Sequence, residues 1–180
     1  MHRPNVIGDW REYGDDHEGI RVRVHSVKRD DVPPEGRDSQ ARKLTYFSFR
    51  VTVENRAEEW FWVELERRHL DVRYGTDGDP AHLDYHSKEI KGFKLYPLRR
   101  VTATFYAAAP ARHLDILGIQ VHLRIDDEPS TAHVWVGGVD VPESATAPSK
   151  KSGKRKNSLA QEVSRFLEEQ GSNPGEAPSG

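Results

Sequence analysis

The sequence predicts an all-β protein, an antiparallel β-sandwich followed by a disordered C-terminal tail with one short amphipathic helix. Three observations predict it. Apolar and polar residues alternate with a period of two in six or more short runs, clusters of turn residues separate these runs, and helical spacing is nearly absent before residue 143. A parallel α/β sheet is disfavoured because the chain offers no crossover helices.

The first two predicted strands carry the clearest alternation. In the segment 20–25, Ile20, Val22 and Val24 share one face. A loop rich in Asp, Pro and Gly follows at 30–39. In the segment 44–55, one face carries Phe47, Phe49, Val51 and Val53, and the other carries Tyr46, Ser48, Arg50 and Thr52. We expect the apolar face of each strand to form the core.

The segment 60–66 follows a turn at 55–59, so we expect it to form a hairpin with the strand before it. Four later strands are expected at 69–74, 101–105, 119–125 and 133–136. The pair Asp77-Gly78 lies in the turn at 75–80, where glycine supplies the positive φ of a tight turn.

Composition changes abruptly after Val141, which predicts four parts: a sandwich at 1–141, a disordered basic linker at 142–157, a short amphipathic helix at 158–170 and a disordered end at 171–180. One face of the predicted helix is apolar, with Leu159, Val163, Phe166 and Leu167. A helix this short is marginal alone in water. We therefore expect it to dock, either on a partner or on its own domain.

The chain has 27 Lys and Arg residues against 29 Asp and Glu residues, and its formal net charge of -2 implies no overall attraction to nucleic acid or anionic membranes. It has no cysteine, which excludes disulfides and thiolate metal sites. Neither a signal-peptide core nor a membrane span is recognisable, so we expect a cytoplasmic protein without a membrane span.

The succession of Ile7-Gly8-Asp9, the strand 19–27 and the strand ending at Asn55 resembles the immunoglobulin-like domains of unknown function that are common in bacterial lipoproteins. The Asp77-Gly78 turn and the segment 101–110 continue the order, over roughly residues 6–139. The resemblance implies an antiparallel immunoglobulin-like β-sandwich, similar in fold to a secreted mycobacterial antigen domain. It carries no catalytic residues, and the chain has no lipid-attachment cysteine.

The motif His82-Leu-Asp84-Tyr-His86 is a candidate metal site, because on one strand its two histidines and its aspartate would project from the same face. An exposed polar strand face is the simpler alternative, since His-Leu-Asp recurs at 69–71 and 113–115. No catalytic motif or phosphate-binding glycine loop is present. We expect a protein that is not an enzyme and needs no cofactor.

Two surfaces are candidates for binding. Trp60 and Trp62 fall on the face opposite Phe61 and Val63, so they point away from the core if the alternation holds. The alternatives are that a loop or the tail covers them, or that the tryptophan face is the inward face. The linker carries a basic patch that could contact phosphates, Lys150, Lys151, Lys154, Arg155 and Lys156, or could simply keep the linker soluble. Specific nucleic-acid recognition is not expected, because acidic residues follow the patch.

Together these features predict an interaction or accessory module with a protein partner. Metal binding at His82, Asp84 and His86 and phosphate contact through the basic patch are the alternatives. Sandwiches also leave edge strands available, so a homodimer through an edge strand remains open.

Overall fold

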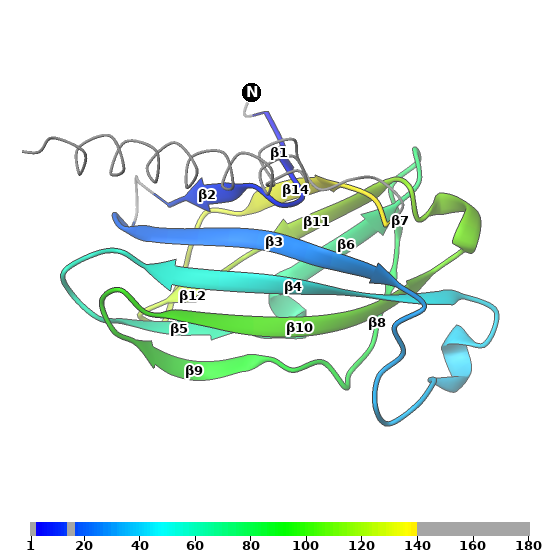
Figure 1. Cartoon of the computed structure of the whole chain (residues 1–180), viewed down its shortest axis with the longest axis horizontal. Helices are drawn as coiled ribbons and strands as arrows, with labels where there is room; N and C mark the ends of the chain where they lie inside the picture. Colours follow the sequence, from blue (N-terminus) through cyan, green and yellow to red (C-terminus); the bar gives the residue numbers. More distant parts are fainter. Residues whose placement is uncertain (1–2, 14–16, 140–180) are drawn as a thin grey trace, which may run out of the picture. The chain divides into compact units, whose positions relative to one another are not determined.

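The computed structural model describes residues 3–13 and 17–139, and these residues form a β-sandwich of two layers (Figure 1). The predicted fold class is confirmed for this part of the chain. The predicted helix at 158–170 and the linker before it lie outside the described residues.

One layer is a five-stranded sheet. Its strands, in spatial order, are β2 (Trp10–Glu12), β3 (Ile20–Arg29), β4 (Thr45–Asn55), β10 (Arg100–Ala109) and β8 (His82–Leu83). β4 lies between β3 and β10 and pairs antiparallel with both, which makes it the central strand of this layer.

The other layer is made of two further sheets, of five and four strands. The first has the order β1 (Asn5–Val6), β14 (His133–Gly137), β11 (Leu117–Val121), β6 (Leu70–Tyr74) and β7 (Asp79–Pro80). The second has the order β13 (Glu128–Pro129), β12 (Arg124–Ile125), β5 (Phe61–Leu65) and β9 (Ile90–Leu95). The described residues also contain three single-turn 3₁₀ helices: η1 (Ser39–Ala41), η2 (Arg67–His69) and η3 (Ala111–His113).

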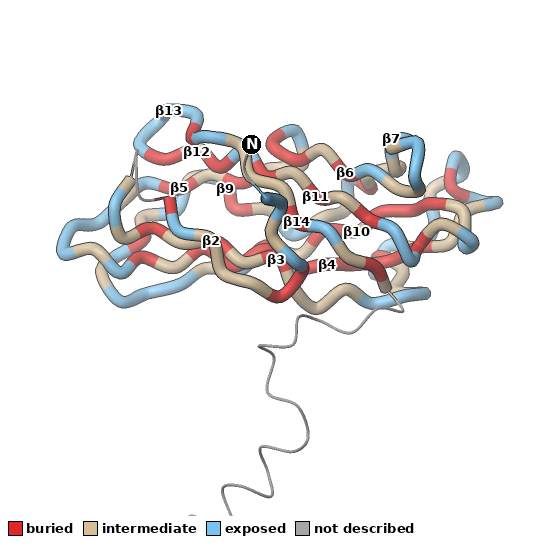
Figure 2. Tube along the Cα trace, turned by 90° about the horizontal axis from the view of Figure 1, so that it is seen from above, coloured by how far each residue is buried: buried red, intermediate tan, exposed pale blue. Residues whose placement is uncertain are grey.

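The core lies between the layers. In the edge-on view of Figure 2 both layers contain buried segments, coloured red. The predicted inward faces supply the core: Ile20, Val22, Val24, Phe47, Phe49, Val51 and Val53 are completely buried. Trp135, Ile119 and Leu65 pack against them from the other layer. Since apolar burial is the main stabilising contribution, the period-two pattern determines which face of each strand points inward.

The predicted hairpin between 44–55 and 60–66 is wrong. β4 pairs with β3 and β10, whereas β5 pairs with β12 and β9 in the other layer. The turn at 55–59 therefore carries the chain from one layer to the other. The physical reason is that each strand has one apolar face, and crossing between the layers buries both faces in one core.

The segment 119–125 also differs from the prediction, because it forms two strands rather than one. β11 ends at Val121 and pairs with β6 and β14, and β12 begins at Arg124 and pairs with β5 and β13. By contrast, the tight turn predicted around Gly78 is confirmed, since Gly78 has φ +69° and residues 75–78 join β6 to β7.

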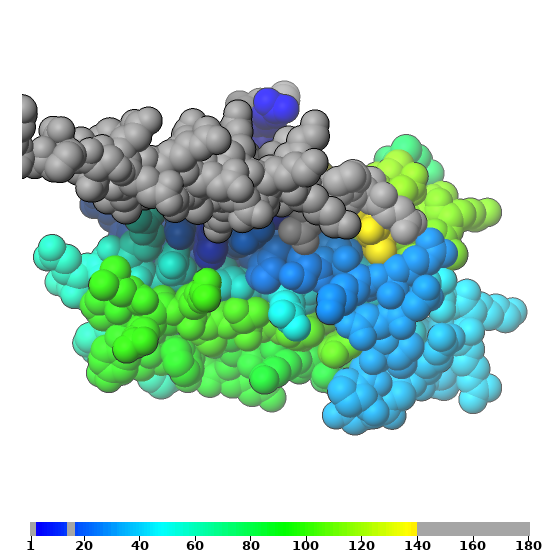
Figure 3. Space-filling model, in the orientation of Figure 1, coloured from blue at the N-terminus to red at the C-terminus, as the bar shows by residue number. Residues whose placement is uncertain are grey.

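The loop between β3 and β4 covers part of the outer face of the first layer. Tyr46 was expected on an exposed face, but it is completely buried there in a small second cluster with Ala41 and Ala108. Space-filling atoms of this loop project beside β3 in Figure 3. A hollow lies between the strands of this face and the loop.

Candidate functional site

A surface of exposed aromatic side chains lies on the outer face of β5 and β9. Trp60 and Trp62 are 48% and 39% exposed, as the alternation predicted, while Val63 and Leu65, which follow them, are buried. Tyr96, just after β9, is 53% exposed. We call Trp60, Trp62, Lys94 and Tyr96 the tryptophan surface.

Lys94 joins the aromatic side chains of this surface. It lies directly opposite Trp62 in the register of β5 and β9. Its Nζ is 3.9 Å from the centre of the Trp60 ring and 5.4 Å from that of Tyr96, so it makes cation–π contacts with both. Among the described residues, no acidic side chain forms an ion pair with Lys94. The surface thus combines exposed apolar area with one unneutralised positive charge.

Gly92 makes room for the Trp62 indole. Its φ is +68°, and a Cβ atom at this position would lie 2.7 Å from Cζ2 of Trp62. The indole therefore covers the glycine backbone at a distance that no other residue would allow. The backbone N–H of Trp62 donates to Asp126 Oδ1 at 2.8 Å, which ties β5 to the turn after β12.

Asn55 determines the course of the chain into Trp60, a role that was not predicted from the sequence. Its side chain is completely buried. Asn55 Nδ2 donates to the carbonyls of Glu59 at 2.7 Å and Leu95 at 3.0 Å, and Asn55 Oδ1 accepts from the Ala57 N–H at 2.8 Å. One amide thus satisfies three backbone groups of the turn and links it to β9.

The candidate metal ligands do not come together as the sequence suggested. β8 ends at Leu83, so His82, Asp84 and His86 do not share the face of one strand. His82 Nε2 lies 3.1 Å from Asp38 Oδ2. Asp84 Oδ1 instead accepts from the backbone N–H of His86 at 2.8 Å and lies 3.1 Å from His86 Nδ1, so only these two of the three side chains meet. No cluster of three histidine or acidic side chains that could hold a metal exists within residues 3–13 and 17–139.

Asp84 has a structural place in the fold instead. It is completely buried, and Asp84 Oδ2 accepts a hydrogen bond from the Tyr46 hydroxyl at 3.0 Å. Burial, and then the charge of Asp84 with Asp38, raise the pKa of the Tyr46 hydroxyl, although the hydrogen bond that it accepts from the Asp38 N–H acts against this. The phenol therefore stays neutral and holds the loop before η1 against the sheet.

The remaining predicted site residues lie beyond the described part of the chain. These are the apolar helix face (Leu159, Val163, Phe166, Leu167) and the basic patch (Lys150, Lys151, Lys154, Arg155, Lys156). Their binding roles stay predictions. No helix within the described residues is long and apolar enough to cross a membrane.

Comparison with solved structures agrees with the fold. A putative lipoprotein of Bacillus subtilis, ycdA, superimposes with a TM-score of 0.51 at 10% identity, over 72% of this chain and 40% of its own. This chain thus spans about two fifths of ycdA. The secreted protein MPT63 of Mycobacterium tuberculosis has a TM-score of 0.47 at 13% identity, over 75% of this chain and 98% of its own.

The likeness to ycdA supports a β-sandwich domain of unknown function, and at 10% identity it extends to the fold alone. No protein-family model and no curated protein matches the sequence. The cytoplasmic location is not tested by these comparisons and stays a prediction.

Proposed function

We propose that this protein is a non-enzymatic accessory module that binds a protein partner through the tryptophan surface. The observation that carries the proposal is the exposure of Trp60, Trp62 and Tyr96 around one lysine. Tryptophan and tyrosine are enriched among the residues that dominate binding energy at protein interfaces. Large aromatics grouped on an outer face are otherwise a cost to a soluble domain.

The partner is a protein segment that presents apolar side chains beside a carboxylate. The apolar side chains would cover the two indoles, and the carboxylate would pair with Lys94, which has no acidic partner among the described residues. Two features support binding at this surface: the three hydrogen bonds of Asn55 and the close fit of Trp62 on Gly92. Both hold the surface in one conformation, and a preorganised surface loses little entropy on binding.

The test is a selection of displayed random peptides on the full chain, followed by titration of the selected peptides. We expect enriched peptides to combine aromatic or branched apolar residues with Asp or Glu. The substitution Trp60→Ala should lower the affinity of the selected peptides by roughly thirtyfold, as for a typical interface hot spot. Lys94→Gln should lower the affinity of the peptides less than Trp60→Ala does, and it should make this affinity depend less on the salt concentration.

Ile116→Ala is the matched control. Ile116 is 43% exposed, but it directly precedes β11, which belongs to a different sheet from β5 and β9. Affinity should be unchanged by this substitution. Peptides that bind Trp60→Ala as tightly as the unaltered chain would remove the proposal, as would the absence of any enriched peptide.

The same selected peptides also test the tail. If the segment 158–170 docks on its own domain over the tryptophan surface, a chain ending after Val141 should bind the peptides more tightly than the full chain. Equal affinity of the two chains would leave the apolar face around Phe166 available to a partner.

A further inference from the structure

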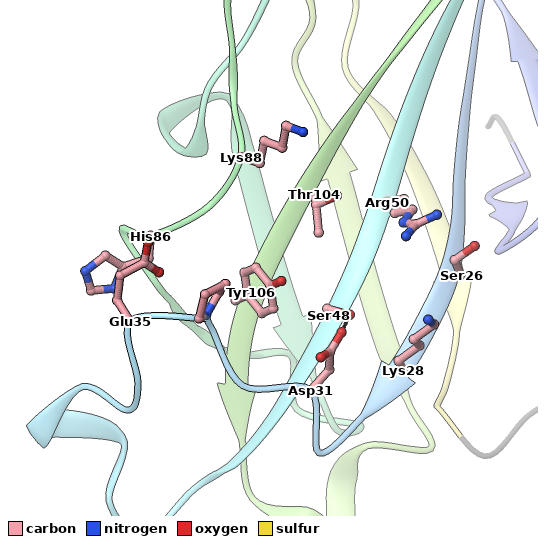
Figure 4. Close-up of a pocket in the computed structure, with 11 residues that line it drawn as sticks. Ser26, Lys28, Asp31, Glu35, Ser48, Arg50, His86, Lys88, Thr104 and Tyr106 are labelled. Atoms are coloured by element: carbon pink, nitrogen blue, oxygen red, sulfur yellow. Dashed lines mark hydrogen bonds between the residues drawn. The ribbon is translucent and has the colours of Figure 1, made fainter.

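A second site lies on the other layer, in a hollow of about 300 Å³ on the outer face of β3, β4 and β10 (Figure 4). Its walls are the loop after β3 and the segment between β8 and β9. The cations Lys28, Arg50 and Lys88 line one side of it, and Asp31 and Glu35 line the other, with Tyr106 between them.

A β-bulge directs Lys28 into this hollow. Ile20, Val22 and Val24 point inward, so strict alternation would also bury residues 26 and 28. The pairing with β4 instead shifts between His25 and Lys28, and Ser26 adopts φ +55°. Val27 consequently packs against the core, and Lys28 is exposed on the outer face. Strained residues and bulges that redirect a side chain are typical of functional sites.

The strand register gathers the other polar side chains next to Lys28. Lys28 lies opposite Ser48, and Ser48 lies opposite Tyr106. Two pairs further along, on the same face, Arg50 lies opposite Thr104, which also forms a β-bridge with Lys88. Side chains directly opposite one another have Cβ atoms about 5 Å apart, so the three cations stand around a space of molecular size.

The charges in the hollow are not neutralised within the protein. Among the described residues, Lys28, Arg50 and Lys88 form no ion pair and no side-chain hydrogen bond. Across the hollow, Asp31 Oδ2 accepts a hydrogen bond from the Ser48 hydroxyl at 2.6 Å. Burial, then Asp31 and Glu35, raise the pKa of Tyr106, against the effect of Arg50, so the hydroxyl of Tyr106 stays a hydrogen-bond donor.

The separation of cations on one side from acidic residues on the other favours a ligand with both an anionic group and hydrogen-bond donors. Three cations from three segments match a dianion such as a phosphate monoester better than a single carboxylate, and arginine can bind phosphate through two hydrogen bonds. The hollow is larger than a phosphate group, and its acidic wall would repel an anion but would accept hydrogen bonds from hydroxyl groups.

We propose that this hollow binds a small phosphorylated polyhydroxy compound, such as a sugar phosphate. Its phosphate lies between Lys28, Arg50 and Lys88, and its hydroxyl groups donate to Asp31 and Glu35. The site is on a different layer from the tryptophan surface and does not depend on the protein partner proposed above.

The test is isothermal titration of the full chain with three probes: glucose 6-phosphate, inorganic phosphate and glucose. We expect glucose 6-phosphate to bind more tightly than inorganic phosphate, and glucose to give no measurable binding. Arg50→Gln should lower the affinity for glucose 6-phosphate by about tenfold or more, which corresponds to the loss of one charge-assisted contact. Glu35→Gln should lower the affinity for glucose 6-phosphate but not that for inorganic phosphate. The substitution removes a carboxylate that accepts hydrogen bonds from the sugar hydroxyl groups, and inorganic phosphate lacks this sugar.

Arg73→Gln removes the same charge from a residue that pairs with Asp71 on the other layer, and it should change nothing. Thermal unfolding of each variant verifies that it is folded. Binding of glucose 6-phosphate that survives in Arg50→Gln, equal binding of inorganic phosphate and glucose 6-phosphate, or no heat with any probe would each overturn the proposal.

Discussion

Two buried polar side chains, Asn55 and His69, hold backbone turns at the ends of β4 and η2. Asn55 supplies both a donor and an acceptor, and it ties the turn before Trp60 to Leu95. His69 uses Nδ1 as an acceptor for the Glu66 N–H at 3.0 Å, which closes the turn of η2. An apolar side chain at either place would leave buried backbone groups without partners.

His69 makes the stability of the fold depend on pH. Burial, and next the charge of Arg68, lower the pKa of His69 below that of an unfolded chain, which is about 6.5. The unfolded chain therefore binds a proton more readily than the folded protein. Stability from the neutral imidazole is fully present above pH 6.5 and is lost as the pH falls through the lower pKa of the folded state.

The substitution His69→Asn tests this. Its Oδ1 can replace Nδ1 as the acceptor but cannot be protonated near neutral pH. We expect the free energy of unfolding, measured with urea between pH 5 and 8, to fall less steeply towards acid in the variant. All other titrating groups are shared by the two proteins, so parallel curves would contradict the role of His69.

At the scale of elements, β9 shows how one strand can serve both the core and a surface. Ile90 and Leu95 at its ends are buried, while Phe93 is 46% exposed and Lys94 contacts Trp60. A register shift between Val63 and Leu65 on β5 accompanies the positive φ of Gly92 on β9. This irregularity brings the Trp62 indole onto the glycine, so the tryptophan surface depends on it.

Gly92→Ala should therefore move the Trp62 ring, and Gly78→Ala is its matched control. The two glycines have nearly the same φ, +68° and +69°, but a Cβ at Gly78 would meet nothing within 4 Å. Both variants should lose about 1 kcal/mol of stability from the backbone conformation. Only Gly92→Ala should shift tryptophan fluorescence to longer wavelength, as the indole is displaced into water. Equal spectra would show that the contact with Gly92 does not hold Trp62.

At the scale of the whole molecule, the N-terminal segment links the two layers. β1 pairs in parallel with β14 in one layer, and the Gly8 N–H donates to the Val24 carbonyl of β3 in the other at 2.8 Å. Trp135 Nε1 donates to the Asp9 carbonyl at 3.0 Å, and Ile7 between these contacts is buried. A few residues thus close one edge of the sandwich.

Truncating Ile7 to alanine should cost roughly 2–4 kcal/mol, because it removes a buried side chain at the point where the layers meet. Its neighbour Val6 is 38% exposed, and Val6→Ala should change the stability by less than about 0.5 kcal/mol. Urea unfolding of both variants measures the difference. A small effect of Ile7→Ala would mean that the layers do not depend on the N-terminal segment.

The sequence by itself determined the class of fold and the inward face of each long strand. Phe47, Phe49, Val51 and Val53 are buried and Trp60 and Trp62 are exposed as their alternation predicted, because burial of apolar area acts on every second residue of a strand. The confirmed turn at Gly78 likewise follows from local backbone preferences. Such features depend only on residues close together in the chain.

Only the tertiary structure decided which strands pair and which polar residues meet. β4 and β5 separate into different layers, and the bulge at Ser26 turns Lys28 towards Arg50 and Lys88. These arrangements result from contacts between residues far apart in sequence. A period-two pattern in one strand contains no information about its neighbours or about a shift in its register, so neither the hollow nor the separation of His82 from Asp84 could be predicted.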